Sequence, residues 1–337
     1  MKNLITSALI AFVAFAQAAL PTSGLPNSNA PFVAHISFEN AAKTSLGKIV
    51  LDEATKAQTQ EKPAKLIERL GIRITDIRDL TLLGNPTDNA ASVVALIRGR
   101  FSKSKIEGFA ASKNVPFKTV AGFKAWDASR LAAAVADEAA APATPGEAAI
   151  FIIVADDSTL LAATEDQLTI AAEALKANKP WNHAALSAGL GSVTQGWLAV
   201  NVDVQAMEAR EAAANPQAAS QPSGAKTAAI ALGENASDVQ LRIAAQFVSE
   251  QKATEQITQL KGLIGFAQLG LMPAAEDSPD DKQKKSDLLS LVQRVKIEQA
   301  GDKGTFSVDY PAAKLSGILR EQIAEAAQEA ANFGSER

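Results

Sequence analysis

Two stretches of this sequence, 146 residues apart, alternate their side chains with the period of two that is typical of a half-buried β-strand. We expect the odd-numbered residues of both stretches to face a hydrophobic core and the even-numbered residues to be wetter. The second stretch consists of Val239, Leu241, Ile243, Ala245 and Phe247, and the first of Val93, Ala95, Ile97, Gly99 and Phe101. The shared order and parity indicate that a module has been duplicated.

A hairpin follows each of these strands at the same interval. The turn at residues 301–304 joins apolar-alternating strands near 295–299 and 306–310. A second turn, at Asp156 and Asp157, lies 146 residues before Asp302 and Lys303 and also separates two apolar strands. The paired hairpins support the duplication.

We therefore expect an α+β fold of two similar modules, residues 31–190 and 191–333. Each module would be a mostly antiparallel sheet packed with helices, in the order strand, helix, strand, strand, helix, hairpin, helix. The alternative is that two similar antiparallel sheets share this rhythm by accident.

Helix and loop signals fill the rest of the chain. Ser249 is a suitable N-cap for a helix over 250–271, and Gly71 ends a short helix over 62–70, which is extra in the first module. A last helix should follow Pro311 and run to about residue 332. We expect exposed loops at 139–147, 214–225 and 273–287.

The N-terminus has the pattern of a secretory signal peptide over residues 1–18. Lys2 precedes an apolar run from Leu4 to Ala16, and the small residues Ala16 and Ala18 suit a cleavage site after Ala18. This run is too short to span a bilayer as a helix. We expect an exported protein, periplasmic or extracellular, with no transmembrane anchor after signal removal and with a disordered leader over 19–30.

Composition excludes several classes of function. The chain has no cysteine, so disulfides and thiolate chemistry are excluded. Its formal net charge is −4, without a basic patch, so we expect no nucleic-acid partner. Aromatic residues make up only 5% of the chain, which supplies few rings for a carbohydrate-binding platform.

The histidines do not suggest a metal or catalytic centre. His35 lies one residue out of step with the apolar positions of a predicted strand, so we expect it to face solvent. His183 follows Trp181 in a connector, where we also expect exposure. No local spacing assembles metal ligands, and we expect no metal and no cofactor.

The Ser-x-x-Lys spacing of penicillin-binding enzymes occurs three times, beginning at Ser45, Ser102 and Ser249. The companion elements of those enzymes are absent. Ser102 and Ser249 are better interpreted as helix N-caps. A catalytic serine is therefore not assigned.

The remaining motifs also have structural interpretations. Gly189 to Ser192 only faintly resembles a phosphate loop and is better interpreted as a flexible joint between the modules. Asp156 and Asp157 fit a hairpin turn, and Thr164 with Gln167 fits a helix capping box. Asn235 to Ser237 fits a turn as well as a glycosylation site. Three acids, Asp277, Asp280 and Asp281, lack the rest of a calcium loop.

In its signal peptide, lack of cysteine, duplicated strand-helix-hairpin modules and alanine-rich loops, the chain resembles uncharacterised exported bacterial proteins. The resemblance rests on pattern and implies no catalytic residues. We therefore expect a non-catalytic exported protein that binds a protein or small-molecule partner through a sheet face or the groove between the modules. The alternative is an extracytoplasmic hydrolase whose site is assembled from residues far apart in sequence.

Overall fold

The computed structural model describes most of the chain after residue 22. It covers residues 23–26, 30–57, 61–84, 92–137, 148–181, 183–214, 223–274, 276, 278–320 and 323. The predicted signal peptide (1–18) and the predicted loop at 139–147 lie outside the described residues.

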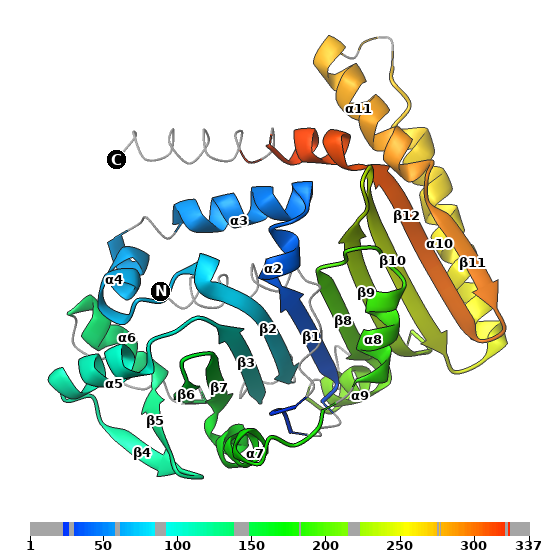
Figure 1. The fold of residues 1–337 in the computed structure, drawn as a ribbon. Coiled ribbons are helices and arrows are strands. Elements are labelled where there is room, and N and C mark those ends of the chain that lie inside the picture. The colour runs from blue at the N-terminus through cyan, green and yellow to red at the C-terminus, as the bar shows by residue number, and fades with distance from the viewer. Residues whose placement is uncertain are drawn as a thin grey trace.

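The described strands form one antiparallel sheet in the order β11-β12-β10-β9-β8-β1-β2-β3-β7-β6-β5-β4 (Figure 1). The strands are β1 Phe32–Ser37, β2 Ile77–Gly84, β3 Val93–Gly99, β4 Phe117–Val120, β5 Phe123–Asp127, β6 Ile150–Asp156, β7 Thr159–Thr164, β8 Leu198–Asp203, β9 Ala225–Glu234, β10 Asp238–Phe247, β11 Lys296–Ala300 and β12 Lys303–Pro311. The helices are α2 Phe38–Ala41, α3 Ser45–Ala57, α4 Glu61–Leu70, α5 Lys103–Ser112, α6 Ala128–Ala136, α7 Glu165–Lys176, α8 Ala184–Gly191, α9 Val204–Ala214, α10 Glu250–Gly270 and α11 Pro279–Val292, with a short 3₁₀ turn η2 at Ile74–Asp76 and further helix over 312–320. The α+β class is confirmed.

The sequence predicts a separate sheet in each module, but the structure has one continuous sheet, because β1 of the first half pairs with β8 of the second. Their antiparallel register places Ala34 opposite Val200 and Phe32 opposite Val202. Ala34 and Val200 are also equivalent in the alternating patterns that begin each half, so the pairing is nearly symmetric about them. Joining two strands that would otherwise be exposed edges satisfies both rows of backbone groups.

The strand order is the same on both sides of this junction. Outward from it the first half runs β1, β2, β3, β7, β6 and the second β8, β9, β10, β12, β11. The halves differ between the central strand and the hairpin, where the first holds α5, β4, β5 and α6 and the second holds α10 and α11. The matching order supports a duplication.

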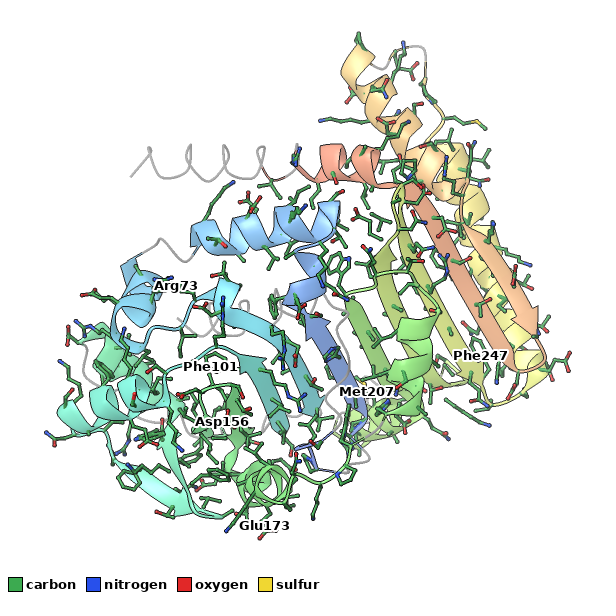
Figure 2. All side chains as sticks on the ribbon, in the orientation of Figure 1. Arg73, Phe101, Asp156, Glu173, Met207 and Phe247 are labelled. Carbon is green, nitrogen blue, oxygen red and sulfur yellow. The ribbon has the colours of Figure 1, made fainter. Side chains whose placement is uncertain are left out.

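Equivalent phenylalanines end the central strands of the two halves, Phe101 after β3 and Phe247 at the end of β10 (Figure 2). Phe101 donates its backbone N–H to the carbonyl of Asp157 at 2.7 Å, and Phe247 donates its own to Asp302 at 2.8 Å. Both aspartates belong to the hairpin turns. Each half therefore ties its central strand to its hairpin in the same way.

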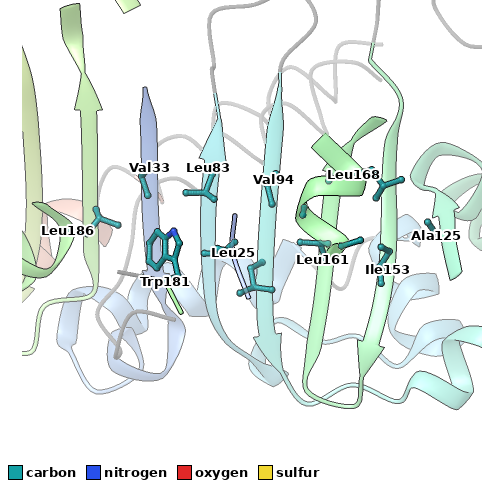
Figure 3. Close-up of a cluster of buried hydrophobic side chains, with 14 of the residues drawn as sticks. Leu25, Val33, Leu83, Val94, Ala125, Ile153, Leu161, Leu168, Trp181 and Leu186 are labelled. Atoms are coloured by element: carbon teal, nitrogen blue, oxygen red, sulfur yellow. The ribbon is translucent and has the colours of Figure 1, made fainter. Parts of the chain in front are cut away.

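Helices cover both faces of the first half of the sheet, which contradicts the expected burial of β3. One face packs on α7, α8 and Leu25 in a cluster that includes Val94 and Leu96 (Figure 3). The opposite face packs Ala95 and Ile97 against the clusters under α3 to α6. The even-numbered Val94 and Leu96 are the more buried set, because neither face of this strand is left to solvent.

Two segments predicted as loops or joints are helical. Within the predicted loop at 273–287, α11 begins at Pro279, and the hydroxyl of its N-cap Ser278 accepts the N–H of Asp281. The glycines at 189 and 191, predicted as a joint, lie in α8, and Leu186 and Leu190 of that helix are buried. Apolar anchoring outweighs the glycines there.

The expected disordered leader over 19–30 is partly ordered. Ser23 forms an antiparallel bridge with Pro180, and Leu25 is fully buried. The described part of this segment therefore belongs to the core.

Candidate functional site

An apolar cavity of about 210 Å³ lies in the first half, between the sheet and helices α4, α5 and α6. None of its lining residues is charged. The lining consists of Leu70, Ile72, Ile77, Ile97, Phe101, Ile106, Ala128, Leu131, Ala132, Ile152, Val154, Leu160, Leu161 and Ala162. A protein cavity of roughly 150 Å³ with such a lining stays dry and accepts benzene or xenon, so this one is large enough for a small apolar molecule.

Small residues help to leave this space open. Ala162 on β7 and Ala128 on α6 stand among larger apolar side chains in the wall, and Ala132 is exposed on α6 at the edge of the cavity. At an equivalent hairpin strand of the second half, α10 lies directly on the sheet. A Cβ atom placed at Gly304 would be 2.8 Å from Cδ1 of Ile257.

Polar contacts hold α4 over this region of the first half. Arg69 forms an ion pair with Asp137 and donates to the carbonyl of Ala134 at 3.2 Å. Lys113 also contacts Asp137, at 2.9 Å. The guanidinium of Arg69, followed by the ammonium of Lys113, holds the pKa of the Asp137 carboxyl well below its ordinary value. Lys105 adds a contact with the carbonyl of Glu68 at 3.0 Å.

His35 is fully buried, so the prediction that it faces solvent is wrong. Its Nδ1 lies 2.8 Å from the hydroxyl oxygen of Thr81 on the neighbouring strand β2. Both faces of β1 are covered by hydrophobic clusters. Ala34 and Ile36 pack in one cluster, and His35 lies on the opposite face of the strand, the face on which Val33 is also buried. Without access to solvent, the imidazole is poorly placed to activate water for a substrate.

Asp79 is a buried carboxylate on β2, two residues before Thr81 and opposite Ser37 of β1. Arg78 donates from Nε to Oδ2 at 3.1 Å, while Oδ1 has no hydrogen-bond partner among the described residues. Burial raises the pKa of the Asp79 carboxyl above its ordinary value, although Arg78 and Arg98 both favour the charged form. The charged form is therefore destabilised in the folded protein.

We expect Asp79→Asn to stabilise the protein at pH 7 and to have little effect at pH 3. Because the pKa of this carboxyl is raised in the folded state, its ionisation lowers the free energy of unfolding. The loss begins as the pH rises above the unfolded-state pKa of about 3.9 and is complete above the folded-state pKa. Urea melts at the two pH values measure the difference. Asp52→Asn, at an exposed site on α3, is the control, and an equal gain at both pH values would contradict the explanation.

The serines of the Ser-x-x-Lys spacings serve helix ends. The hydroxyl of Ser102 accepts the N–H of Lys105 at 3.3 Å, and that of Ser249 accepts the N–H of Lys252 at 3.2 Å. Both predicted N-caps are confirmed. Ser45 begins α3, and its N–H donates to Glu234.

The predicted turns are also confirmed, but the predicted capping box is not. Asp156 accepts the N–H of Ser158 at 2.7 Å in the first hairpin turn, and Asn235 accepts that of Ser237 at 2.8 Å between β9 and β10. Thr164 is the N-cap of α7 but makes no side-chain cap hydrogen bond. Its hydroxyl instead accepts the N–H of Val93, which ties β7 to β3.

The second histidine and the acidic residues near 280 are not among the residues that line the cavity. His183 is half-buried as the N-cap of α8, where it accepts the N–H of Leu186 at 3.3 Å, and burial lowers the pKa of its imidazole. Asp277 lies outside the described residues. Within the described ranges, no group of three or more metal-ligating side chains could hold an ion. No helix in this part of the chain is long and apolar enough to cross a bilayer.

No family model matches this chain, and the curated proteins searched contain no match either. Its fold is distantly similar to solved structures of a bacterial protein, TP0453. Crystal form III has a TM-score of 0.47 at 8% identity and covers 90% of this chain and 99% of that chain. Crystal forms IV and I have TM-scores of 0.44 and 0.42 at 8% and 9% identity, and each covers 90% of this chain and 97% of that chain. Similarity at this level carries no inference about function.

Proposed function

We propose that this chain is an exported, non-catalytic protein that binds a small apolar molecule in the first-half cavity. The observation that carries the proposal is the uncharged cavity of about 210 Å³ between the sheet and α4, α5 and α6. Sites for small ligands are concave and mostly apolar, and the lining of this cavity has that composition. A pocket without polar groups favours retention of a ligand over chemical conversion.

The N-terminal sequence supports export. The positive start, the apolar run and the small-x-small site at Ala16 to Ala18 are typical of a cleaved signal. An apolar molecule outside the cytoplasm is poorly soluble and benefits from a protein that shields it from water. The apolar lining of the proposed site and the predicted export of the protein are therefore compatible with a carrier or a sensor of apolar molecules.

Filling the cavity is expected to weaken ligand binding without unfolding the protein. We expect the mature chain to bind toluene, and Ala162→Leu to weaken that binding by about tenfold or more, because the added side chain occupies the ligand's space. Isothermal titration measures the affinity. The thermal transition of each variant checks that it is folded.

Two further variants sharpen the test. Ala111→Leu makes the same change at an exposed position on α5 outside the lining and should leave toluene binding unchanged. Leu160→Ala removes a buried wall residue and should admit a larger aromatic such as naphthalene. The proposal fails if the mature chain does not bind toluene, or if Ala162→Leu and Ala111→Leu bind it equally.

A further inference from the structure

The C-terminal part of α10 exposes a concentration of large apolar side chains. Leu263 is 66% exposed, Phe266 75%, Leu269 63%, and Met272, just beyond the helix, 56%. The only charged residue from 260 to 272 is Lys261. Contiguous exposed apolar surface on a soluble domain marks a site of interaction.

The sheet covers only the first part of this helix. Ala253 and Ile257 are buried against it, while Leu260 is already 36% exposed. Apolar residues nevertheless continue along α10 on the side that faces away from the sheet. A helix that is apolar on all sides is normally buried, and the exposed side chains at 263, 266 and 269 have no covering partner among the described residues.

Five residues of this outer side lie within one arc. At 100° per residue, Gly262, Leu263, Leu269 and Gly270 all fall within roughly 60° of Phe266. Ile257 falls on the opposite side, which agrees with its burial against the sheet. An arc of roughly 120° matches the width that a helix buries against a neighbour.

The pattern of this arc is symmetric about Phe266. Leucines stand three residues to each side, at 263 and 269, and glycines stand four residues to each side, at 262 and 270. A Cβ atom placed at either glycine would meet nothing within 4 Å. Glycine weakens an exposed helix relative to alanine, and close approach of another backbone is a physical use for it.

We propose that this surface of α10, residues 260–272, binds the same surface of a second copy of the chain. In an antiparallel helix pair with its two-fold axis at Phe266, Leu263 of each copy faces Leu269 of the other, and Gly262 faces Gly270. Such an isologous contact requires one surface to be complementary to itself, which the symmetric pattern provides. The absence of acidic residues and the single Lys261 leave little charge repulsion between copies.

The contact is small, so the dimer should be reversible. The segment 260–270 is roughly 15 Å long, and a helix pair of that length buries less than the ~800 Å² per partner of a standard interface. We expect a dissociation constant on the order of micromolar.

Sedimentation velocity on the mature chain over about 1 to 100 μM measures this equilibrium. We expect dimerisation in the parent chain and a dissociation constant at least about tenfold higher in Phe266→Glu, because the charge would be buried at the axis. Ile170→Glu is the matched control, since Ile170 is 55% exposed on α7, and it should dimerise like the parent.

Cross-linking tests the geometry in a chain that has no natural cysteine. Phe266→Cys should form an intermolecular disulfide with itself, because residues at a two-fold axis can approach within the roughly 7 Å between Cα atoms that a disulfide needs. Ile170→Cys should not do so at the same rate. A mixture of Leu263→Cys and Leu269→Cys chains should cross-link faster than either variant alone.

Three outcomes overturn the proposal. They are a monomer throughout the concentration range, a dimer that Phe266→Glu does not weaken, and equal cross-linking of the Phe266→Cys and Ile170→Cys variants. If the parent is monomeric but binds neutral phosphatidylcholine vesicles, and Phe266→Glu abolishes that binding, the surface is a lipid contact instead.

Discussion

Replacing Glu234 with alanine is expected to destabilise the protein by about 2 to 4 kcal/mol, because it leaves two backbone N–H groups at the start of a helix without their acceptor. Glu234 ends β9 in the second half and is only 5% exposed. Its carboxylate accepts the N–H of Ser45 at 2.7 Å and that of Leu46 at 3.1 Å, both at the start of α3 in the first half. A carboxylate at a helix N-terminus is also stabilised by the helix dipole.

Urea denaturation measures this loss as a change in the free energy of unfolding. Glu298→Ala removes the same side chain from an exposed position on β11 and should change stability by less than about 0.5 kcal/mol. Glu234→Gln retains one acceptor oxygen and should fall between the two. Equal stabilities for Glu234→Ala and Glu298→Ala would show that this contact between the halves does not stabilise the fold.

The contact illustrates why local features could be predicted from the sequence and long-range ones could not. Ser249 as an N-cap and Gly71 as a helix end follow from neighbouring residues, and both are confirmed; Gly71 has a φ of +74°. Glu234 and Ser45 are 189 residues apart. No local signal marks their contact, because it depends on how β1 and β8 join the halves.

Burial of individual strand residues was predicted only in part. On β10, Val239 and Phe247 are buried, as expected for the odd-numbered set, but Leu241, Ile243 and Ala245 are only half-buried, like the even-numbered Gln240, Arg242 and Gln246. On β1, a position out of step with its apolar neighbours carries His35, which is buried. Alternation with a period of two predicts an exposed side chain at such a position only where one face of the sheet meets solvent, and here α7 and α8 cover that face.

The cavity could not be predicted, although its wall residues are ordinary core residues in the sequence. Ile152, Val154 and Leu160 fit a predicted hairpin whether or not space remains above them. The space depends on how α4, α5 and α6 rest on the sheet, which is set by packing over the whole first half. The alanines at 128 and 162 are the only local sign, in a chain where alanine is common.

Leu25→Ala is expected to destabilise the protein by about 2 to 5 kcal/mol, the range for removing a fully buried leucine side chain. Leu25 is 0% exposed and packs in the cluster under α7 and α8 (Figure 3). Gly24, at a φ of +88°, donates its N–H to the carbonyl of Lys179 at 3.0 Å, and Arg98 donates to the carbonyl of Ser23 at 3.1 Å. These contacts hold the segment against the sheet.

This result would distinguish an anchored segment from the disordered leader that its Pro, Ser, Asn and Gly content predicts. Because a disordered segment buries nothing, truncating Leu25 would then cost less than about 0.5 kcal/mol, the same as the control Ile170→Ala at a 55% exposed position. Urea melts of the two variants decide between these outcomes. A large loss for Leu25→Ala alone would show that the fold begins before β1, since its core includes a side chain that lies seven residues ahead of Phe32.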